Sequence, residues 1–188
     1  MPGDVMWEWE ALENECKNCT KCELHKSREN VVIGRGNRNA KMMFIGEAPG
    51  ANEDRLGKAF VGKAGQLLDL ALTGLGITEE DIYICNILKC RPPRNANPTD
   101  EQARQCMPNL MRQIEMVSPK VIVLLGGQAL KHLVDGSLGI TRARGNWTEF
   151  RDIPVMPTYH PAALLRDGTK KLDMWRDIKE AWKRNQNN

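Results

Sequence analysis

Four apolar runs along the chain predict buried β-strands. They cover residues 41–46, 81–88, 120–126 and 153–158. Within each run apolar residues follow one another instead of alternating with polar ones, which is typical of parallel strands that are covered on both faces. No run reaches the roughly 18 apolar residues that a membrane span needs.

Helical patterns lie between and around these runs. The expected helices cover residues 5–15, 65–75, 100–117, 128–134 and 172–184. Thr99 can cap the third of them, and Pro119 lies just beyond its end. The alternation of strands and helices predicts an α/β fold, with three α/β/α layers around a central, mainly parallel, four-stranded sheet.

Length and composition are typical of a single globular domain. The chain has 188 residues, 41% of them hydrophobic and 27% charged, with a formal net charge of +3. We expect one domain over residues 1–188, with a frayed tail at 185–188. The N-terminus is acidic and has no apolar stretch like that of a signal peptide, so we expect a cytoplasmic monomer with no membrane partner. A secreted disulfide scaffold is excluded.

Distinctive residues follow the carboxyl ends of the predicted strands. Gly46-Glu47 follows the first run, Asn86 lies near the end of the second, Gly126 follows the third and His160 follows the fourth. In open parallel sheets, ligands bind at this edge. Each residue alone is compatible with a turn, but the four strand ends together predict a binding crevice.

The six cysteines occur in different settings. Cys85 lies inside the second apolar run and is expected to be a small buried core residue. The others are Cys16, Cys19 and Cys22, in one polar stretch, and Cys90 and Cys106. In a reducing cytosol, clustered cysteines indicate metal binding or catalysis rather than disulfides. Both Cys16/Cys19 and Cys19/Cys22 have the Cys-x2-Cys spacing that can turn back onto one ion or cluster.

Four segments carry a resemblance to a known family. They are GEAPGANED at 46–54, FVGKAG at 60–65, NILKCRPP at 86–93 and HPAALLR at 160–166. In this order they resemble motifs of the family 4 uracil-DNA glycosylases, the iron–sulfur branch of the uracil-DNA glycosylase superfamily. The similarity extends from about Cys19 to about Arg166. It implies a hydrolase that excises uracil from single- or double-stranded DNA, leaves an abasic site and so initiates base-excision repair.

The resemblance also implies a [4Fe–4S] cluster, held by a Cys-x2-Cys pair and by a second, more widely spaced pair. Cys90 and Cys106 match the second pair. The family pattern that continues after the first pair selects Cys19 and Cys22 and leaves Cys16 spare. The cluster is expected to be structural and to pin the N-terminal segment to the loop at 89–98.

Two other metal sites fit the spacing less well. A bacterial ferredoxin motif needs a cysteine at position 26, where this chain has Lys26. A four-cysteine zinc site usually joins two short-spaced pairs, and the separation of Cys90 from Cys106 is too long for one of them. The spacing therefore favours iron–sulfur over zinc.

Three residues are candidates for binding the base. A glycosylase has to bring its target nucleotide out of the duplex into a pocket, or act on single strands. Phe60 is the candidate stacking face, and Asn86 is the candidate reader of the uracil edge. The Asn86 amide can donate to uracil O4 and accept from N3–H, and both bonds are inverted in cytosine. His160 matches the His-Pro motif of the family, which implies that it donates to uracil O2 as the glycosidic bond breaks.

Glu47 and Glu53 are the candidate catalytic carboxylates. In the best-known branch of the superfamily, an aspartate that positions the attacking water follows the residue aligned with Glu47, but here that position is Ala48. Ala48 is therefore expected only to line the substrate pocket. Glu47 is the first choice for ordering water and stabilising the cationic sugar. Glu53 either has this role or shapes the pocket against the thymine methyl group.

Candidate DNA contacts lie in two segments. Leu164 is the expected wedge that fills the gap left by the extruded base, with Leu165 as the alternative, and Arg166 is expected to meet a phosphate. The loop after Asn86 supplies three candidates for contacts with the DNA backbone: Lys89, Arg91 and Arg94. A replication clamp is a candidate protein partner.

Other functions stay open on the sequence alone. A non-catalytic DNA-binding relative would not need Asn86, Glu47 and His160 together. A relative that is covalently trapped on uracil DNA uses a histidine in the segment after the asparagine, and residues 87–94 contain none. An iron–sulfur electron carrier and a glycosylase for other deaminated bases are two further alternatives. No lysine is placed to form a Schiff base, so we expect a monofunctional enzyme.

Overall fold

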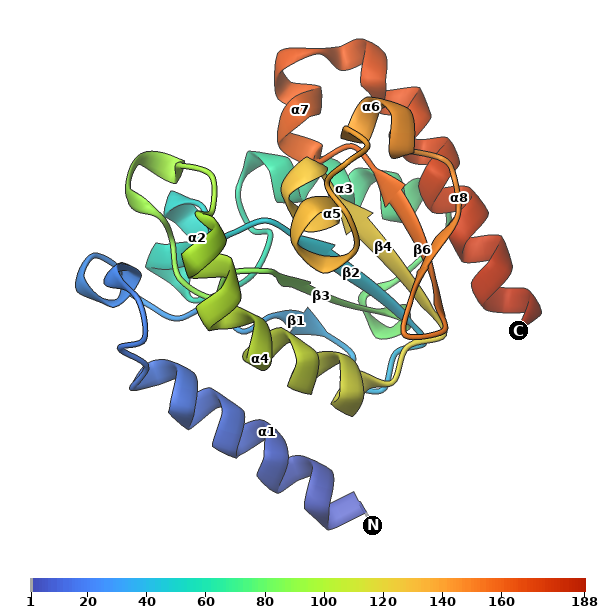
Figure 1. Ribbon diagram of the computed structural model, residues 1–188. Coiled ribbons are helices and arrows are strands. Elements are labelled where there is room, and N and C mark those ends of the chain that lie inside the picture. Colours follow the sequence, from blue (N-terminus) through green and yellow to red (C-terminus); the bar gives the residue numbers. More distant parts are fainter. Residues whose placement is uncertain (1) are drawn as a thin grey trace.

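A six-stranded mixed sheet forms the centre of the structure (Figure 1). The computed structural model describes residues 2–188, with side chains from Met6 onward. The strands are β1 (Arg35–Gly36), β2 (Met42–Gly46), β3 (Ile82–Asn86), β4 (Val121–Leu125), β5 (Thr148–Phe150) and β6 (Ile153–Thr158). Their order across the sheet is β1-β3-β2-β4-β6-β5.

The parallel core of the sheet consists of β3, β2, β4 and β6. All four strands lie within the predicted apolar runs, so this part of the fold prediction is confirmed. At the two edges, β1 pairs with β3 and β5 pairs with β6 in antiparallel orientation. The prediction of a four-stranded sheet missed these edge strands, because they have only two and three residues and are partly exposed.

The helices are α1 (Pro2–Lys17), α2 (Ala51–Leu56), α3 (Lys63–Gly74), α4 (Asp100–Val117), α5 (Gly127–Leu133), α6 (Ile140–Ala143), α7 (Pro161–Arg166) and α8 (Lys171–Asn187). Short 3-10 turns cover Glu23–Lys26, Glu79–Asp81, Pro93–Asn95 and Gly168–Lys170. The predicted helices correspond to α1, α3, α4, α5 and α8. The sequence did not predict α2, α6 and α7, which have four to six residues each. Within residues 2–188, no helix combines the length and apolar character needed to traverse a bilayer.

The C-terminal helix extends further than the sequence predicted. We expected residues 185–188 to fray, but α8 continues to Asn187. The ammonium group of Lys120, just before β4, donates a hydrogen bond of 2.6 Å to the carbonyl oxygen of Asn188. This contact joins the end of α8 to the end of the sheet at which β4 begins.

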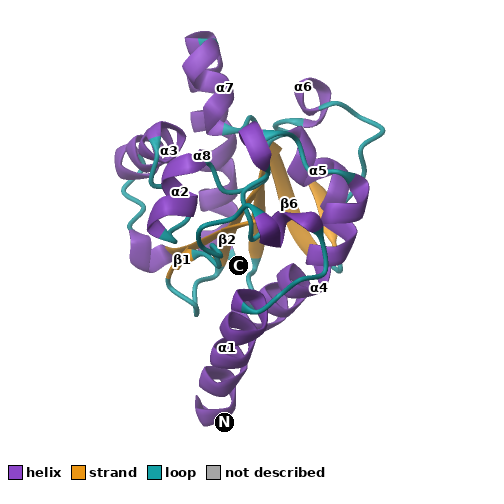
Figure 2. Cartoon of the chain, turned by 90° about the vertical axis from the view of Figure 1, so that its left-hand side faces the viewer, coloured by secondary structure: helices purple, strands orange, loops and turns teal. Residues whose placement is uncertain are grey.

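Helices cover both faces of the sheet, as the three-layer prediction requires (Figure 2). From β2, Met43 and Ile45 pack into one core together with residues of α1, α4 and α5. Met42 and Phe44 pack into the other core, with residues of α3, α7 and α8. All four side chains are completely buried. The continuous apolar character of this run therefore reflects cover on both faces.

The start of α4 is determined by a capping box. Thr99 Oγ1 accepts a hydrogen bond from the Gln102 backbone N–H at 3.1 Å, and Gln102 Oε1 accepts one from the Thr99 N–H at 3.1 Å. These bonds satisfy two N–H groups that a helix start leaves unpaired. At the other end, Ser118 leaves the helix in the left-handed conformation, with φ of 51°. Hence α4 has the bounds that the sequence predicted.

A buried ion pair holds α8 against the end of β6. The Asp177 carboxylate is 3% exposed. It accepts hydrogen bonds from Thr158 Oγ1 at 2.7 Å and from Arg144 Nε at 2.9 Å. Since Thr158 is the last residue of β6, this contact supports the strand end that leads to His160.

We expect Asp177→Ala to lower the free energy of unfolding by about 3 kcal/mol, because it leaves the Thr158 hydroxyl and Arg144 without their partner. Urea denaturation measures this. The control is Glu180→Ala on the exposed part of α8, which removes only the surface pair with Lys183 and should change stability by less than about 0.5 kcal/mol. Equal, small losses in the two variants would contradict the anchoring role of Asp177.

Candidate active site and thiol pocket

A cleft of about 590 Å³ lies at the carboxyl ends of the parallel strands. Glu47 follows β2, Asn86 ends β3 and His160 follows β6, and all three line this cleft. Gly46 is paired with Asn86 in the register of β2 and β3. The parallel pairing therefore brings residues that are far apart in the sequence to one edge of the sheet.

Asn86 places a buried amide in the wall of the cleft. The residue is 2% exposed, and its Oδ1 accepts no hydrogen bond from the described residues. A Cβ atom on Gly46 would lie 2.6 Å from this Oδ1 and 2.5 Å from Cζ of Phe60. Only glycine at position 46 therefore lets the amide and the ring occupy their places. A buried acceptor without a partner is costly, which indicates that a ligand donates to it.

Phe60 reaches the cleft from a strained backbone position. Its φ is 52°, in the left-handed region, which costs a residue other than glycine about 1–2 kcal/mol. The ring is almost fully buried, and its centroid lies 5.8 Å from that of the His160 ring. Such strain persists only where surrounding contacts determine the conformation.

Arg35 of β1 supplies part of those contacts. Its Nε donates to the carbonyl oxygen of Ala59 at 2.8 Å, and its Nη2 donates to that of Phe60 at 3.3 Å. The same guanidinium pairs with Asp69 at 2.7 Å. The start of α3 also packs tightly against this loop, since a Cβ on Gly65 would lie 1.8 Å from the Phe60 oxygen.

Glu53 holds the residues that follow Phe60. Its Oε1 accepts hydrogen bonds from the backbone N–H groups of Val61 at 3.2 Å and Gly62 at 3.0 Å. Glu53 also lines the cleft. The sequence analysis named it as a catalytic candidate and did not anticipate this anchoring contact.

Glu47 lines the cleft, and its carboxylate, unlike that of Glu53, is not used to hold a backbone loop of the described residues. Its backbone oxygen accepts a hydrogen bond from the Leu88 N–H at 3.1 Å, which fixes the residue beside β3. Burial raises the pKa of the Glu47 carboxyl, with no opposing contribution from another described group. Ala48, next in the chain, lines the same cleft. Of the two candidate carboxylates, Glu47 is the one whose side chain accepts no hydrogen bond from the described residues, so it can bind a ligand or a water.

His160 is held as a neutral hydrogen-bond donor. It is the N-cap of α7, where its Nδ1 accepts a hydrogen bond from the Ala162 N–H at 3.0 Å. In the neutral ring the proton is therefore on Nε2. Burial and the nearby Arg166 lower the pKa of His160 to about 4, so the ring is uncharged at pH 7. Gly126, with φ of 95°, allows this packing. A Cβ atom added at this position would clash with the Cβ of His160, at a distance of 2.8 Å.

The two leucines of α7 have different surroundings. Leu164, the expected wedge, is 4% exposed and packs in the core with α3 and α8, so this prediction is wrong. Leu165 is 52% exposed and lines the cleft together with Arg166. Consecutive residues of a helix point about 100° apart, and the sequence predicted no helix over this segment. Leu165 is thus the side chain available to contact DNA.

The basic loop after β3 supplies fewer surface charges than expected. Lys89 is 1% exposed, so its predicted contact with the DNA backbone is wrong. Arg91 is half-buried, and its Nε donates to Asn95 Oδ1 at 2.8 Å. Arg94 is exposed, in the left-handed conformation with φ of 56°. Arg94 is therefore the most accessible of the three.

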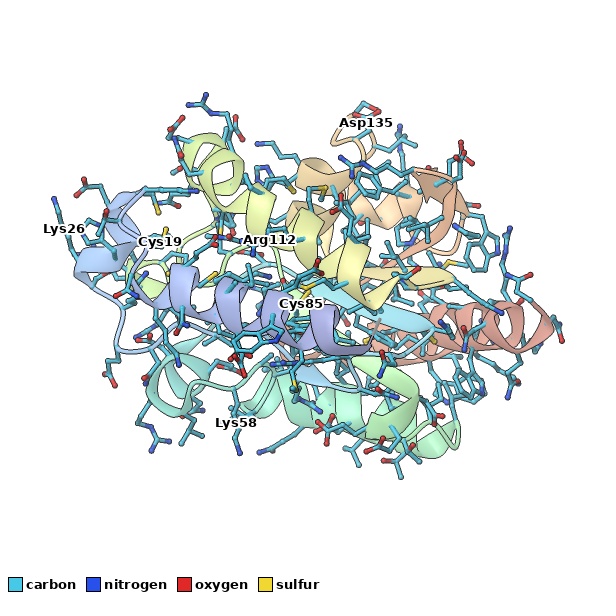
Figure 3. All side chains as sticks on the ribbon, turned by 90° about the horizontal axis from the view of Figure 1, so that it is seen from below. Cys19, Lys26, Lys58, Cys85, Arg112 and Asp135 are labelled. Carbon is cyan, nitrogen blue, oxygen red and sulfur yellow. The ribbon has the colours of Figure 1, made fainter. Side chains whose placement is uncertain are left out.

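A second pocket is lined by five of the cysteines, namely Cys16, Cys19, Cys22, Cys90 and Cys106. Cys19 lies just beyond the C-terminal end of α1, whereas Cys85 lies near the centre of the molecule (Figure 3). Cys85 is completely buried in the core, as predicted. Among the residues described, no three His, Cys, Asp or Glu side chains meet closely enough to hold a single metal ion.

The surroundings of these thiols fit a group with thiolate ligands. Arg28 Nη1 donates to the Cys90 sulfur at 3.1 Å, and Asn109 Nδ2 lies 3.9 Å from the Cys106 sulfur. Such N–H donors to ligand sulfurs are typical of iron–sulfur sites. Burial raises the pKa of Cys90 to about 11, and Arg28 opposes this effect. Ligation of a metal would release the proton of this thiol.

The sequence analysis missed several residues of the cleft. Asn52, Lys63, Asn95 and Asn97 also line it. Lys63 belongs to the FVGKAG segment, whose resemblance could have singled it out. Asn95 and Asn97 are brought to the rim by the strained turn at Pro93–Asn95, for which the sequence holds no comparable signal.

Comparisons with known proteins identify similar chains. The family model described as "Uracil DNA glycosylase superfamily" matches residues 33–184. The "Type-4 uracil-DNA glycosylase" of Thermotoga maritima is 47% identical over 167 residues, which cover 87% of this chain and 86% of that protein. The protein of the same name from Archaeoglobus fulgidus is 45% identical over 162 residues, covering 82% and 81%. That from Sulfurisphaera tokodaii is 39% identical over 180 residues, covering 91% and 82%.

The different surroundings of Glu47 and Glu53 predict opposite effects on stability. The folded state raises the pKa of Glu47, so the unfolded chain ionises this group more easily. We expect Glu47→Gln to increase the free energy of unfolding at pH 7. The gain should vanish below about pH 4, where the carboxyl is protonated in both states.

Glu53→Gln is the matched variant. It weakens the charge-assisted bonds from Val61 and Gly62, so we expect a loss of about 1 kcal/mol at pH 7. Urea denaturation at pH 7 and at low pH measures both variants. A Glu47→Gln protein less stable than the wild type at pH 7 would contradict this description of the cleft.

Proposed function

Because the chain belongs to the uracil-DNA glycosylase superfamily, we propose that it hydrolyses the glycosidic bond of deoxyuridine in DNA. The reaction releases uracil, leaves an abasic site and so starts base-excision repair. The observation that supports this most directly is the unpaired Asn86 Oδ1, buried in a cleft beside Phe60 and His160. The names of the similar Type-4 proteins support the same substrate.

Asn86 would select uracil by the edge of the base. The target nucleotide leaves the stack and enters the cleft, where the ring of Phe60 offers a flat face. Asn86 Oδ1 accepts from uracil N3–H, and its Nδ2 donates to uracil O4. Cytosine presents an acceptor where uracil has N3–H, so it would leave the buried amide unpaired. Polar mismatch in a dry pocket is a strong basis for discrimination.

His160 would stabilise the departing base. As the C1′–N1 bond breaks, its electron pair passes to uracil and negative charge develops on O2. The Nε2–H of the neutral ring donates to this oxygen, and the bond becomes stronger as the charge grows. Since its pKa is about 4, His160 acts at pH 7 as a donor without being an imidazolium.

Glu47 would act on the sugar side. Its carboxylate stabilises the positive charge that develops on the sugar and orients a water toward C1′. The water oxygen bonds to C1′, and Glu47 accepts the proton that the water loses. The anchoring contacts of Glu53 with Val61 and Gly62 support Glu47, rather than Glu53, in this role.

DNA would be held at the rim of the cleft. Leu165 fills the space that the extruded base leaves, and Arg166 and Arg94 contact phosphates. The roles assigned here need no residue from a second copy, so we propose that the protein acts as a monomer. Reduced thiols are compatible with a cytoplasmic location. A replication clamp stays a candidate partner.

We assign a [4Fe–4S] cluster to the thiol pocket, with Cys19, Cys22, Cys90 and Cys106 as ligands. When bound, it would cross-link the segment after α1 to the loop after β3 and to α4. The convergence of these cysteines on one pocket supports the assignment, as do the hydrogen bonds from Arg28 and Asn109. Cys16 is a fifth thiol of this pocket, without an assigned role as ligand.

Base recognition is tested with oligonucleotides that carry one uracil, single-stranded or duplex, analysed on a denaturing gel after alkali. We expect cleavage at uracil that requires alkali, and none at cytosine or thymine. Asn86→Ala should slow single-turnover excision about 100-fold, because two hydrogen bonds of about 1–2 kcal/mol each are lost.

The control for this test is Asn52→Ala, which removes an exposed asparagine of the same cleft. This variant should stay within about threefold of the wild type, in line with the small effects of surface substitutions. Equal rates for Asn86→Ala and the wild type would overturn the assignment of the uracil edge to Asn86.

The pH dependence of excision distinguishes Glu47 from His160. Glu47 must be ionised for the reaction, and burial raises its pKa above the usual carboxyl value of 4.5. As the pH is lowered, activity should therefore begin to fall at a pH above 4.5. His160 stays neutral until about pH 4. In Glu47→Gln, the rate should drop about 100- to 10,000-fold, and the acid limb should move down to the pKa of His160. An unchanged acid limb in this variant would exclude Glu47 as its source.

A further inference from the structure

Lys89 is a buried cation without a carboxylate partner. The residue is 1% exposed, although long lysine side chains normally extend their charge to water. Its Nζ donates to the backbone oxygen of Asn86 at 2.6 Å. Among the described residues, no aspartate or glutamate lies within salt-bridge distance of it. A carbonyl dipole compensates only part of a full charge, so this arrangement is costly unless an anion lies nearby.

The thiol pocket lies next to this charge. Lys89 lines the pocket and directly precedes Cys90. Burial raises the pKa of Cys16 and of Cys85, and the Lys89 ammonium opposes the rise in both. Its positive charge therefore acts on one sulfur that lines the pocket, Cys16, and on one in the core, Cys85.

Arg28 is a second cation at this pocket, and it is partly buried. It donates to the Cys90 sulfur at 3.1 Å and to the Lys17 carbonyl at 2.9 Å. It too forms no salt bridge with a carboxylate of the described residues. The pocket thus combines two cations with five cysteine side chains.

We propose that Lys89 is the buried counter-charge of the metal–thiolate group in this pocket and connects that group to the strand end carrying Asn86. The proposal rests on the cluster assigned above. Four thiolates outweigh the positive charge of a cubane core, so the loaded site is anionic. The same ammonium holds the Asn86 carbonyl, which joins the cluster to the base-reading residue through one side chain.

The sign of the contribution of Lys89 to stability then depends on the metal. In the loaded protein its charge is compensated, and Lys89 stabilises the fold. In the metal-free protein its charge is uncompensated, and Lys89 destabilises the fold. A side chain that only fills space would stabilise both forms.

The experiment compares Lys89→Met with the wild type, loaded and metal-free. Methionine has a similar length and no charge. We expect the variant to melt several degrees lower when loaded and several degrees higher when metal-free. Loaded Lys89→Met should also release iron to a chelator about tenfold faster, measured by the loss of cluster absorbance. This rate needs only the loaded protein, so it stands even if the metal-free chain does not fold.

Two further variants complete the test. Lys21→Met removes an exposed lysine at the rim of the same pocket and should leave the melting temperatures and the release rate unchanged. Lys89→Gln keeps a donor for the Asn86 carbonyl but loses the charge, so it should release iron as fast as Lys89→Met.

Three results would overturn the proposal. The first is a Lys89→Met protein that loses stability equally in both forms, and the second is one that releases iron at the wild-type rate. The third is a wild-type protein that binds no metal, which would remove the cluster assignment as well. Uracil excision is measured separately on oligonucleotides, so failure of the counter-charge can be distinguished from failure of the proposed activity.

Discussion

The parallel pairing of β2 with its neighbours is the constraint on which the site depends. It brings the end of β2 beside the end of β3, so that Gly46 faces Asn86. The absence of a side chain at Gly46 then leaves room for the Asn86 amide and the Phe60 ring. The pairing of β4 with β6 positions His160 at the same edge, packed against Gly126. A shift of one residue in either register would separate these groups.

Around this edge of the sheet the protein has several features that lower the stability of the ligand-free fold. Phe60 has a left-handed backbone, Glu47 is a half-buried carboxylate, and the Asn86 oxygen accepts no hydrogen bond from the described residues. A base and a sugar in the cleft would compensate the last two of these features. Lys89 has the same character at the thiol pocket, where a bound metal group would compensate its charge. Such concentration of strain and unpaired polarity is typical of functional sites.

The sequence predicted the features that depend on local patterns. Apolar runs located the four parallel strands, and Thr99 located the start of α4. It did not predict features that depend on tertiary contacts. The edge strands β1 and β5 are too short to produce a pattern. Leu164 and Leu165 are chemically equivalent in the sequence, and only the rotation of α7 separates a core residue from an exposed one. Lys89 resembled a surface charge because its burial arises from the segments packed around it.

The most direct test of the account identifies the products of the reaction by mass spectrometry. Purified protein is incubated with an oligonucleotide that contains one uracil, and both the DNA and the free bases are analysed. We expect free uracil and an oligonucleotide whose backbone is intact but which lacks that one base. An unchanged oligonucleotide would contradict the assignment of the cleft as a uracil-excising site. DNA covalently joined to the protein would contradict the hydrolytic roles of Glu47 and His160.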